Sequence, residues 1–388
     1  MGVPPDLVGF VESAGLSTAV AYGVDSQKQV ESDVFQNWWR VRNPLTAVQR
    51  LRDYATDGWA QMSSVLTSLS DGSDLILTGT TYQEIAANVA EYRGLPLATL
   101  HYFPARPNAV LGDLLPLPLP ASFVRAGMVV GEWGYWRLLK PAEDAQRREL
   151  GLPRATTRSM RRIVEHGTLE LQAYDEALFP GLAQEWGGKR PFIGSITMEL
   201  STETDDDVAQ WIASGTPPIY FGFGSTPIER PDELLAMIEA VCAELGERAL
   251  ICSGIWSNRI GEDSVKVVKL VNYPAVFPSC RAVVHHGGAG TTAAGLRAGV
   301  PTVILWSVAD QPVWANRVER LKVGVAQRFS RISQDSLLAA LQTVLAPDYE
   351  TRARALATRM TKPSEGVGRA ADLLEAATEH ARGDKPAR

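Results

Sequence analysis

The segment Val283–Thr292, which reads VVHHGGAGTT, decides the fold of this chain. Its β-branched start is typical of a buried strand, and that strand ends in two histidines. Four small residues then let the backbone turn tightly before two threonines begin an alanine-rich helix. Such a turn leaves several backbone N–H groups unpaired at the positive end of a helix, where a phosphate group is favoured. The segment therefore predicts a strand-turn-helix unit that binds an anion.

Two common phosphate motifs do not account for this turn. No Lys followed by Ser or Thr comes after the glycines, which excludes a P-loop, and no G-x-G-x-x-G opens the first strand. A glycine-rich turn can also serve only the close packing of a helix on a sheet. The paired His285 and His286 favour a ligand. Buried polar side chains at a strand end need a hydrogen-bonding partner, and a diphosphate would provide one.

From about residue 215 onward, short apolar runs alternate with amphipathic helical patterns. This alternation is typical of a parallel sheet covered by helices, as in a Rossmann-like domain. The predicted strands are Ile219–Gly224, Arg248–Ser253, Val265–Val271, Arg281–His286, Pro301–Trp306 and Val323–Phe329. The predicted helices are Pro231–Leu245, Ala289–Ala298, Gln311–Leu321 and Gln334–Leu345.

The length of 388 residues predicts two domains. Upstream, predicted strands at Asp74–Gly79 and Leu97–Phe103 surround a helix at Tyr82–Tyr92, so the first half is also α/β. An acidic run and a Thr-Pro-Pro sequence between residues 202 and 218 mark the boundary. We therefore predict an N-terminal domain over residues 1–204, a C-terminal domain over 205–364, and a terminal helix and tail over 365–388. We expect that helix to pack back on the N-terminal domain.

The chain begins unlike a doubly wound domain, which opens with a central strand, a glycine-bearing turn and a helix. Here a Pro-started amphipathic helix over residues 4–16 comes first, and a strand at Thr18–Tyr22 follows it. We therefore expect the N-terminal domain to be incomplete, with its first strand and the following loop belonging before Gly2. A smaller, differently wound domain is the alternative.

Composition excludes several classes of function. The formal net charge of −6 argues against a general nucleic-acid binder, which needs a concentrated basic face. The three cysteines have no metal-ligand spacing and are interpreted as reduced core residues. The most apolar stretch, Leu114–Val130, is interrupted by three prolines and Arg125, so we expect no membrane span. The first residues lack the layout of a signal peptide, and we expect a cytoplasmic protein.

The sequence VHHGGAGTTAAGLRAGVPTVILWSVADQPVWANRV, over residues 284–318, resembles the donor-binding signature of the GT-B fold UDP-glycosyltransferase family, closest to its bacterial sterol- and antibiotic-glucosylating members. PPIYFGFGS, ending at Ser225, resembles the first strand of the family's C-terminal domain, and ALICSG the second. Val271–Tyr273 resembles the start of its nucleobase loop. The resemblance implies two Rossmann-like domains whose parallel sheets face a central cleft, with a UDP-sugar bound by the C-terminal one.

The resemblance also implies which residues bind the donor. His285 and the backbone from Gly287 to Thr291 would hold the diphosphate, with Ser225 and Ser253-Gly254 closing the other side. Asp310-Gln311 matches the acidic and amide pair that binds sugar hydroxyls, a role that suits a carboxylate acceptor beside an amide. The complete predicted donor set is Ser225, Ser253, Gly254, His285, Gly287, Gly288, Ala289, Gly290, Thr291, Asp310 and Gln311. Asn316 is a weaker match.

In this family a helix dipole and backbone amides take the place of a divalent metal, so we expect no metal and no cofactor. The family's catalytic base, an Asp or a His, lies in the loop after the first N-terminal strand. That part is not found here, so no catalytic residue is assigned. Independently of the family, Asp310 would cap a helix with Pro312 in its first turn, and we expect this role to coexist with sugar binding.

Other residues have two interpretations each. His286 is interpreted as a core imidazole, and His101 could face the cleft or lie in the core. The run Asp205–Asp207 invites a metal-binding interpretation, but a solvated acidic run is favoured. An aromatic cluster in the first half is first explained by core packing, although a mobile lid formed with Leu114–Pro120 over an apolar acceptor is the alternative. The cluster comprises Trp38, Trp39, Trp59, Trp133, Tyr135 and Trp136.

Two hypotheses of function therefore stand. The first is an inverting glycosyltransferase that moves a hexose, glucose by resemblance, from a UDP-sugar to a hydroxyl of a lipophilic small molecule such as a sterol, lipid or secondary metabolite. The second is a pseudoenzyme or partner subunit that binds a nucleotide sugar but has no catalytic base.

Overall fold

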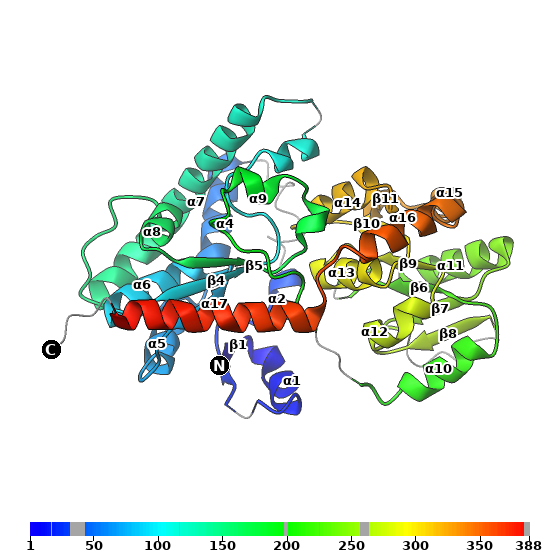
Figure 1. Ribbon diagram of the computed structural model, residues 1–388, viewed down its shortest axis with the longest axis horizontal. Coiled ribbons are helices and arrows are strands. Elements are labelled where there is room, and N and C mark those ends of the chain that lie inside the picture. The colour runs from blue at the N-terminus through cyan, green and yellow to red at the C-terminus, as the bar shows by residue number, and fades with distance from the viewer. Residues whose placement is uncertain are drawn as a thin grey trace.

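The computed structural model describes residues 1–16, 18–31, 43–115, 117–197, 201–224, 226–256 and 264–383. Within them the chain forms two α/β halves that lie side by side (Figure 1). All strand pairs in both halves are parallel. The α/β class predicted from the sequence is confirmed. No helix among the described residues has the length and apolarity needed to cross a lipid bilayer.

The second half contains a six-stranded sheet in the order β11-β10-β9-β6-β7-β8. Its strands are β6 (Ile219–Gly222), β7 (Ala249–Cys252), β8 (Val265–Val268), β9 (Ala282–His285), β10 (Thr302–Trp306) and β11 (Gly324–Arg328). The sheet grows in one direction from β6 to β8 and in the other from β9 to β11, so the strand order reverses between β6 and β9. In open α/β sheets the ligand binds at such a reversal, outside the carboxyl ends of the strands.

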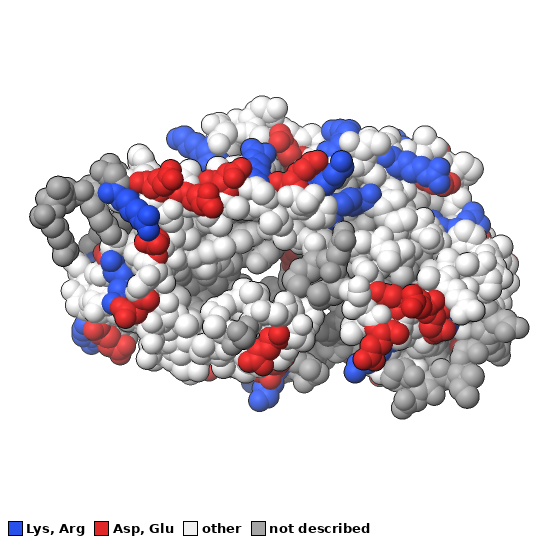
Figure 2. Space-filling view, turned by 60° about the horizontal axis from the view of Figure 1, so that its bottom comes forward, with Lys and Arg blue, Asp and Glu red and all other residues white. Residues whose placement is uncertain are grey.

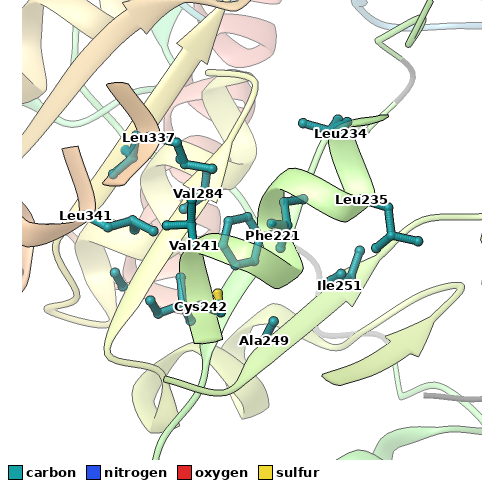
Figure 3. Close-up of a cluster of buried hydrophobic side chains, with 14 of the residues drawn as sticks. Phe221, Leu234, Leu235, Val241, Cys242, Ala249, Ile251, Val284, Leu337 and Leu341 are labelled. Carbon is teal, nitrogen blue, oxygen red and sulfur yellow. The ribbon is translucent and has the colours of Figure 1, made fainter. Parts of the chain in front are cut away.

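Helices cover both faces of this sheet. They are α10 (Asp205–Ala213), α11 (Pro231–Leu245), α12 (Tyr273–Val276), α13 (Ala289–Arg297), α14 (Gln311–Arg320), α15 (Gln334–Val344) and α16 (Pro347–Ala357). The boundaries of α11 follow from its sequence, because Pro231 occupies its first turn and Gly246 ends it with φ +66°. Its buried side chains gather around Phe221 and Val284 of the sheet (Figure 3).

The first half has two smaller sheets. One pairs β1 (Gly2–Val3) with β2 (Val20–Ala21), and the other has the order β3-β4-β5, formed by β3 (Ile76–Gly79), β4 (Leu97–His101) and β5 (Leu169–Gln172). The helices are η1 (Pro5–Leu7), α1 (Val8–Ser13), α2 (Ser26–Glu31), α4 (Pro44–Thr56), α5 (Trp59–Leu69), α6 (Gln83–Arg93), η3 (Val110–Leu114), α7 (Ala121–Glu149), α8 (Ser159–Glu165), η4 (Glu176–Leu178) and α9 (Leu182–Glu185).

The prediction that a helix opens the chain is wrong. The strand β1 precedes the helix and pairs with β2, where Val20 donates its N–H to the carbonyl of Met1 at 2.8 Å and Tyr22 donates to Val3 at 2.7 Å. Two residues are too few to show an alternating pattern, which is why periodicity missed β1. The helix predicted over residues 4–16 is divided into η1 and α1.

The last helix, α17 (Pro363–Gly383), returns to the first half and lies along it (Figure 1). Its Ala370 packs with Leu171 of β5 and with Ile193. The chain leaves the first half after Gly194 and comes back through Thr361, and these two residues touch. A Cβ atom added at Gly194, whose φ is +73°, would lie 2.5 Å from Cβ of Thr361. The N–H of Thr361 also donates to Oδ2 of Asp175 at 2.8 Å.

Aromatic side chains join the two halves. Tyr174, just beyond the end of β5, meets Trp314 of α14 edge-on at 6.3 Å between ring centroids, and Phe179 meets the same indole at 5.6 Å. Because α14 begins where β10 has ended, the carboxyl ends of the two main sheets face each other. Figure 2 shows a hollow near the middle of the face that α17 borders.

Candidate functional site

The predicted donor residues lie along one edge of the six-stranded sheet. Gly222, the last residue of β6, is in register with Cys252 on one side and with His285 on the other. The turns that follow these three strands therefore start side by side at the strand-order reversal. Ser225, predicted to contact the donor, lies outside the described residues.

The turn after β9 needs its glycines. Gly287 has φ +91°, and a Cβ atom there would lie 2.7 Å from Cγ2 of Ile304 and 3.3 Å from Cβ of Gln311. Any other residue at this position would therefore have a strained backbone, and its side chain would collide with β10 and α14. A Cβ atom at Gly288 would lie 2.6 Å from Nε2 of His286. At Gly290 a Cβ atom would meet no atom within 4 Å, so the turn is tight on its inner side and open at Gly290.

The start of α13 presents unpaired backbone donors. Gly288 occupies the cap position with an extended backbone and no side-chain cap. The first helical hydrogen bond of α13 runs from the N–H of Thr292 to the carbonyl of Gly288 at 3.0 Å. The N–H groups of Gly288, Ala289, Gly290 and Thr291 have no partner among the described residues. Four free amides at the positive end of a helix form a site for an anionic group.

His285 adds a side-chain donor to these amides. It is fully buried, and burial, supported by the neighbouring His286, holds its pKa well below the usual 6.5. The backbone N–H of Gly287 donates to Nδ1 at 3.0 Å. Nδ1 is therefore unprotonated, and the neutral ring carries its proton on Nε2. That Nε2 is buried and has no partner among the described residues.

His286 is held between two glycine turns. Its ring lies so close to Gly224 and Gly288 that a Cβ atom at Gly224 would stand 2.7 Å from Cε1 of the imidazole. Burial lowers the pKa of His286, while a contact with the backbone of Gly222 and the charge of Asp310 oppose the shift. This position agrees with packing as its main role, and its Nδ1 has no partner within the described part of the chain.

Asp310 and Gln311 reach the same edge from the end of β10, and both make hydrogen bonds within the chain. Oδ2 of Asp310 accepts from the indole Nε1 of Trp314 at 2.8 Å. The side chain of Asp310 does not cap α14, so the predicted capping role is wrong. The backbone explains this difference, because Asp310 has a helical conformation (φ −84°, ψ −7°) in place of the extended one that a capping side chain needs.

Gln311 supports the loop before α14. Its Oε1 accepts from the N–H groups of Ser307 and Val308 at 2.7 and 3.1 Å. Ala309, directly before the acidic residue, has φ +58°, a left-handed conformation that costs free energy for a residue with a side chain. The fold thus imposes backbone strain next to Asp310 and leaves its Oδ1 without a partner among the described residues.

On the opposite side of β6, the same sheet edge is formed by the turn after β7 and by the loop before α12. The Ser253 N–H donates to the carbonyl of Val268 at 2.8 Å, while its Oγ accepts from the N–H of Ile255 at 3.2 Å. A Cβ atom at Gly254 would meet no atom within 4 Å. Tyr273 stacks on Phe277 with 4.7 Å between ring centroids, and its hydroxyl interacts with the side chain of Thr291. The predicted nucleobase loop is thereby tied to the turn after β9.

Three candidates from the sequence lie away from this edge. Asn316 donates from Nδ2 to the carbonyl of Asp113 in the first half at 3.1 Å. His101 is fully buried in the first half beside Thr99, and burial holds its pKa well below 6.5, so it is a core residue. In the acidic run, Asp205 accepts from the N–H of Thr202 at the start of α10, and Asp207 pairs with Lys266.

The members of the predicted aromatic cluster differ in their exposure to solvent. Trp59 and Trp136 are buried and donate to Gln146 and Glu143, whereas Trp133 and Tyr135 are exposed. Trp38 and Trp39 lie outside the described residues. Core packing therefore explains two of the members.

Sequence reasoning missed two residues that shape the site. Trp314 orients Asp310, and its signal was the four-residue spacing that places both on one face of α14. Asp113 of η3 pairs with Arg317 at 2.6 Å and with Arg320 at 2.9 Å, and so ties α14 to the first half. Nothing in the sequence pairs residues so far apart.

Comparison with known proteins places this geometry among sugar-transferring enzymes. Residues 258–373 match the family model described as Erythromycin biosynthesis protein CIII-like, C-terminal domain. An uncharacterized glycosyltransferase of Mycobacterium tuberculosis, Rv1524, is 57% identical over 98% of this chain and 92% of its own length. Glycosyltransferase GtfE of Amycolatopsis orientalis is 32% identical over 86% of this chain and 81% of its own. The sterol 3-beta-glucosyltransferase UGT80B1 of Arabidopsis thaliana is 28% identical over 74% of this chain and 48% of its own.

Solved structures share the fold. The glycosyltransferase of kitacinnamycin superimposes with a TM-score of 0.69 at 19% identity, over 97% of this chain and 90% of that one. The glycosyltransferase VinC, solved in complex with dTDP, superimposes with a TM-score of 0.64 at 18% identity, over 98% and 92% of the two chains.

Proposed function

The chain belongs to the GT-B glycosyltransferases, and from this premise we propose that it transfers a hexose, with glucose as the first candidate, from a UDP-sugar to a hydroxyl of a lipophilic small molecule. Transfer of a sugar to a small-molecule acceptor follows from the family. The nucleotide, the sugar and the acceptor class are the proposal.

One observation carries the donor part of this proposal. Within the part of the chain that the structure describes, four amides at the start of α13 and the Nε2–H of His285 have no partner, and all belong to one turn at the strand-order reversal. A diphosphate carries the charge and the acceptor oxygens that these donors need. When the sugar bond breaks, negative charge grows on the leaving diphosphate, and donors already in position stabilise that charge without reorganising.

We propose that the diphosphate is bound without a metal ion. The positive end of α13 and its free amides supply the attraction that a divalent cation would otherwise provide. On this proposal, adding a chelator leaves the affinity for the nucleoside diphosphate unchanged.

The nucleobase and the acceptor are argued from Tyr273 and from the relatives. Tyr273 stacks beside the turn and suits a pyrimidine, but VinC was solved with dTDP, so thymidine is the competitor of uridine. The similarity to a plant sterol 3-beta-glucosyltransferase supports an acceptor with a rigid apolar body and a hydroxyl group. A cytoplasmic location remains a prediction.

Calorimetric titration with UDP, dTDP and UDP-glucose tests the donor site. We expect UDP to bind, and His285→Ala to lose about 1.5–3 kcal/mol of binding free energy, as for a hydrogen bond to a charged group. The matched control is His166→Ala, because His166 is exposed in the first half. Equal affinity of the parent and His285→Ala for every nucleotide would refute the site, and tighter binding of dTDP than of UDP would correct the nucleobase.

A further inference from the structure

Helix α7 is packed along only half of its length. From Trp136 onward it contributes five buried residues to the first half, but before Trp136 the only buried residue is Val124. In Figure 1 the helix rises from the body of the first half, and the loop that precedes it lies at the top edge of the view. The beginning of α7 and this loop therefore extend away from the core.

This extension carries large apolar side chains that contact little. Leu117 is 70% exposed and Phe123 is 68% exposed. We call the set the α7 apolar tip, and it comprises Leu114, Leu115, Leu117, Leu119, Phe123, Val130 and Trp133. Phe123, Val130 and Trp133 are spaced by seven and three residues, so they lie on one face of the helix. So many exposed apolar side chains in one stretch mark an interaction surface.

The tip itself carries basic side chains and no acidic ones. Between Leu114 and Gly131 the sequence has no acidic residue, although the whole chain has 44 acidic and 38 basic ones. Arg125 and Arg137 are exposed beside the apolar side chains. Arg125 pairs with Glu185 at 2.9 Å, whereas Arg137 lies over the ring of Trp133. The next acidic side chain, Glu132, is paired with Arg158 at 3.3 Å. A second copy of the chain would place arginines against arginines, whereas an anionic surface would attract them.

We propose that the α7 apolar tip inserts into the surface of a lipid bilayer that contains anionic head groups. Such a surface binds helices that lie in the membrane interface without crossing the bilayer. These helices typically combine leucine, phenylalanine and tryptophan side chains with arginines. The inference goes beyond the proposed function, because none of these residues belongs to the donor edge. It also gives a lipophilic acceptor a route from the membrane into the first half.

Sedimentation of the full chain with vesicles tests the inference. Vesicles of phosphatidylcholine with about 30% phosphatidylglycerol represent an anionic membrane surface, and pure phosphatidylcholine is the neutral reference. We expect binding to the anionic vesicles. The double substitution Leu117→Ser and Phe123→Ser should lower the partition coefficient about tenfold or more, because both side chains lose apolar area that enters the lipid. Arg137→Gln should weaken binding to anionic vesicles only.

The control substitution is Val367→Ser, because Val367 is 50% exposed on α17, far from α7 in sequence and outside the donor edge. It should leave vesicle binding unchanged, and every variant should melt as the parent does and retain UDP affinity. A chain that stays in solution with both vesicle types, or a double variant that binds as the parent does, overturns the proposal. Concentration-dependent self-association that the double substitution abolishes would assign the tip to a second copy and would also overturn it. A parent chain that does not bind UDP would refute the proposed function, and it would leave the conclusion on vesicle binding unaffected.

Discussion

The indole Nε1 of Trp314 donates to Oδ2 of Asp310 at 2.8 Å, across one turn of α14. Trp314 is almost fully buried between the halves, where Phe179 and Tyr174 contact its ring. A residue fixed by the interface thus sets the orientation of the carboxylate proposed to bind the sugar.

Replacing Trp314 should separate binding of the sugar from binding of the nucleotide. We expect Trp314→Phe to weaken UDP-glucose about tenfold, the effect of one lost hydrogen bond, and to leave UDP unchanged. Calorimetry with both ligands measures the difference, and Trp211→Phe on α10 serves as the control for shortening an indole elsewhere. An equal loss for the two ligands would contradict the role given to Asp310.

Substitution by alanine should change the free energy of unfolding differently at Gly287 and at Gly290. Gly287→Ala forces a side chain into a left-handed conformation and against Ile304, so we expect a loss of about 1–3 kcal/mol in the free energy of unfolding. Gly290→Ala lies in the helix with open space, and we expect no loss or a gain of about 0.5 kcal/mol. Urea unfolding compares them directly, and equal destabilisation would show that the turn is not built as described.

The ion pair of Asp113 with Arg317 should matter more than an exposed one. Arg317 is buried, so Asp113→Ala leaves a charge without its carboxylate, and we expect a loss of about 1–3 kcal/mol in the free energy of unfolding. The control is Glu233→Ala, which breaks an exposed pair with Arg230 and should cost less than about 1 kcal/mol. Similar losses in urea unfolding would argue against a tie between the halves.

Glu84 makes stability depend on pH. Burial raises the pKa of Glu84 from 4.5 to about 7, with a further rise from Glu143 and opposite effects from Arg106 and Arg162. Because the folded pKa lies above the unfolded one, the contribution to stability is complete below about pH 4.5 and is lost as pH rises to about 7. The loss amounts to about 3 kcal/mol over this window.

The isosteric variant Glu84→Gln isolates that effect, since other titrating groups cancel in the comparison. We expect the free energy of unfolding of the variant to exceed that of the parent increasingly between pH 5 and pH 8, with most of the gain reached near neutrality. Urea unfolding at several pH values provides the measurement. A difference that stays constant with pH would mean that Glu84 is ionised in the folded chain throughout.

The central strands β6, β7, β9 and β10 of the second half were predictable because each is a short apolar run that is buried on both faces. The predicted Arg281–His286, for example, is β9 at Ala282–His285. The unpaired amides after β9 also follow from sequence, since any helix start leaves such groups. Elements without a regular pattern were not predicted. Helix α7 contains Pro141 in its interior, and β5 reads LELQ, so the buried Glu170 and Gln172 interrupt its apolar pattern.

Contacts between residues far apart in the sequence could not be predicted from residue spacing along the chain. Asp113 and Arg317 are 204 residues apart, and their pairing depends on how the two halves pack. The predicted capping role of Asp310 was wrong for a different reason. An acidic residue before Gln-Pro usually caps a helix, but here the strained Ala309 turns the backbone so that the carboxylate points to Trp314.

The contact of Gly194 with Thr361 has a mechanical consequence. The outgoing and returning segments of the chain pass each other at one point, so both covalent connections between the halves share a pivot. We therefore expect any change in the space between the sheets to occur by rotation about that point, because sliding of one half along the other would have to stretch both connections. A bulky side chain at position 194 would act as a wedge there and would change the angle between the halves without touching either sheet edge.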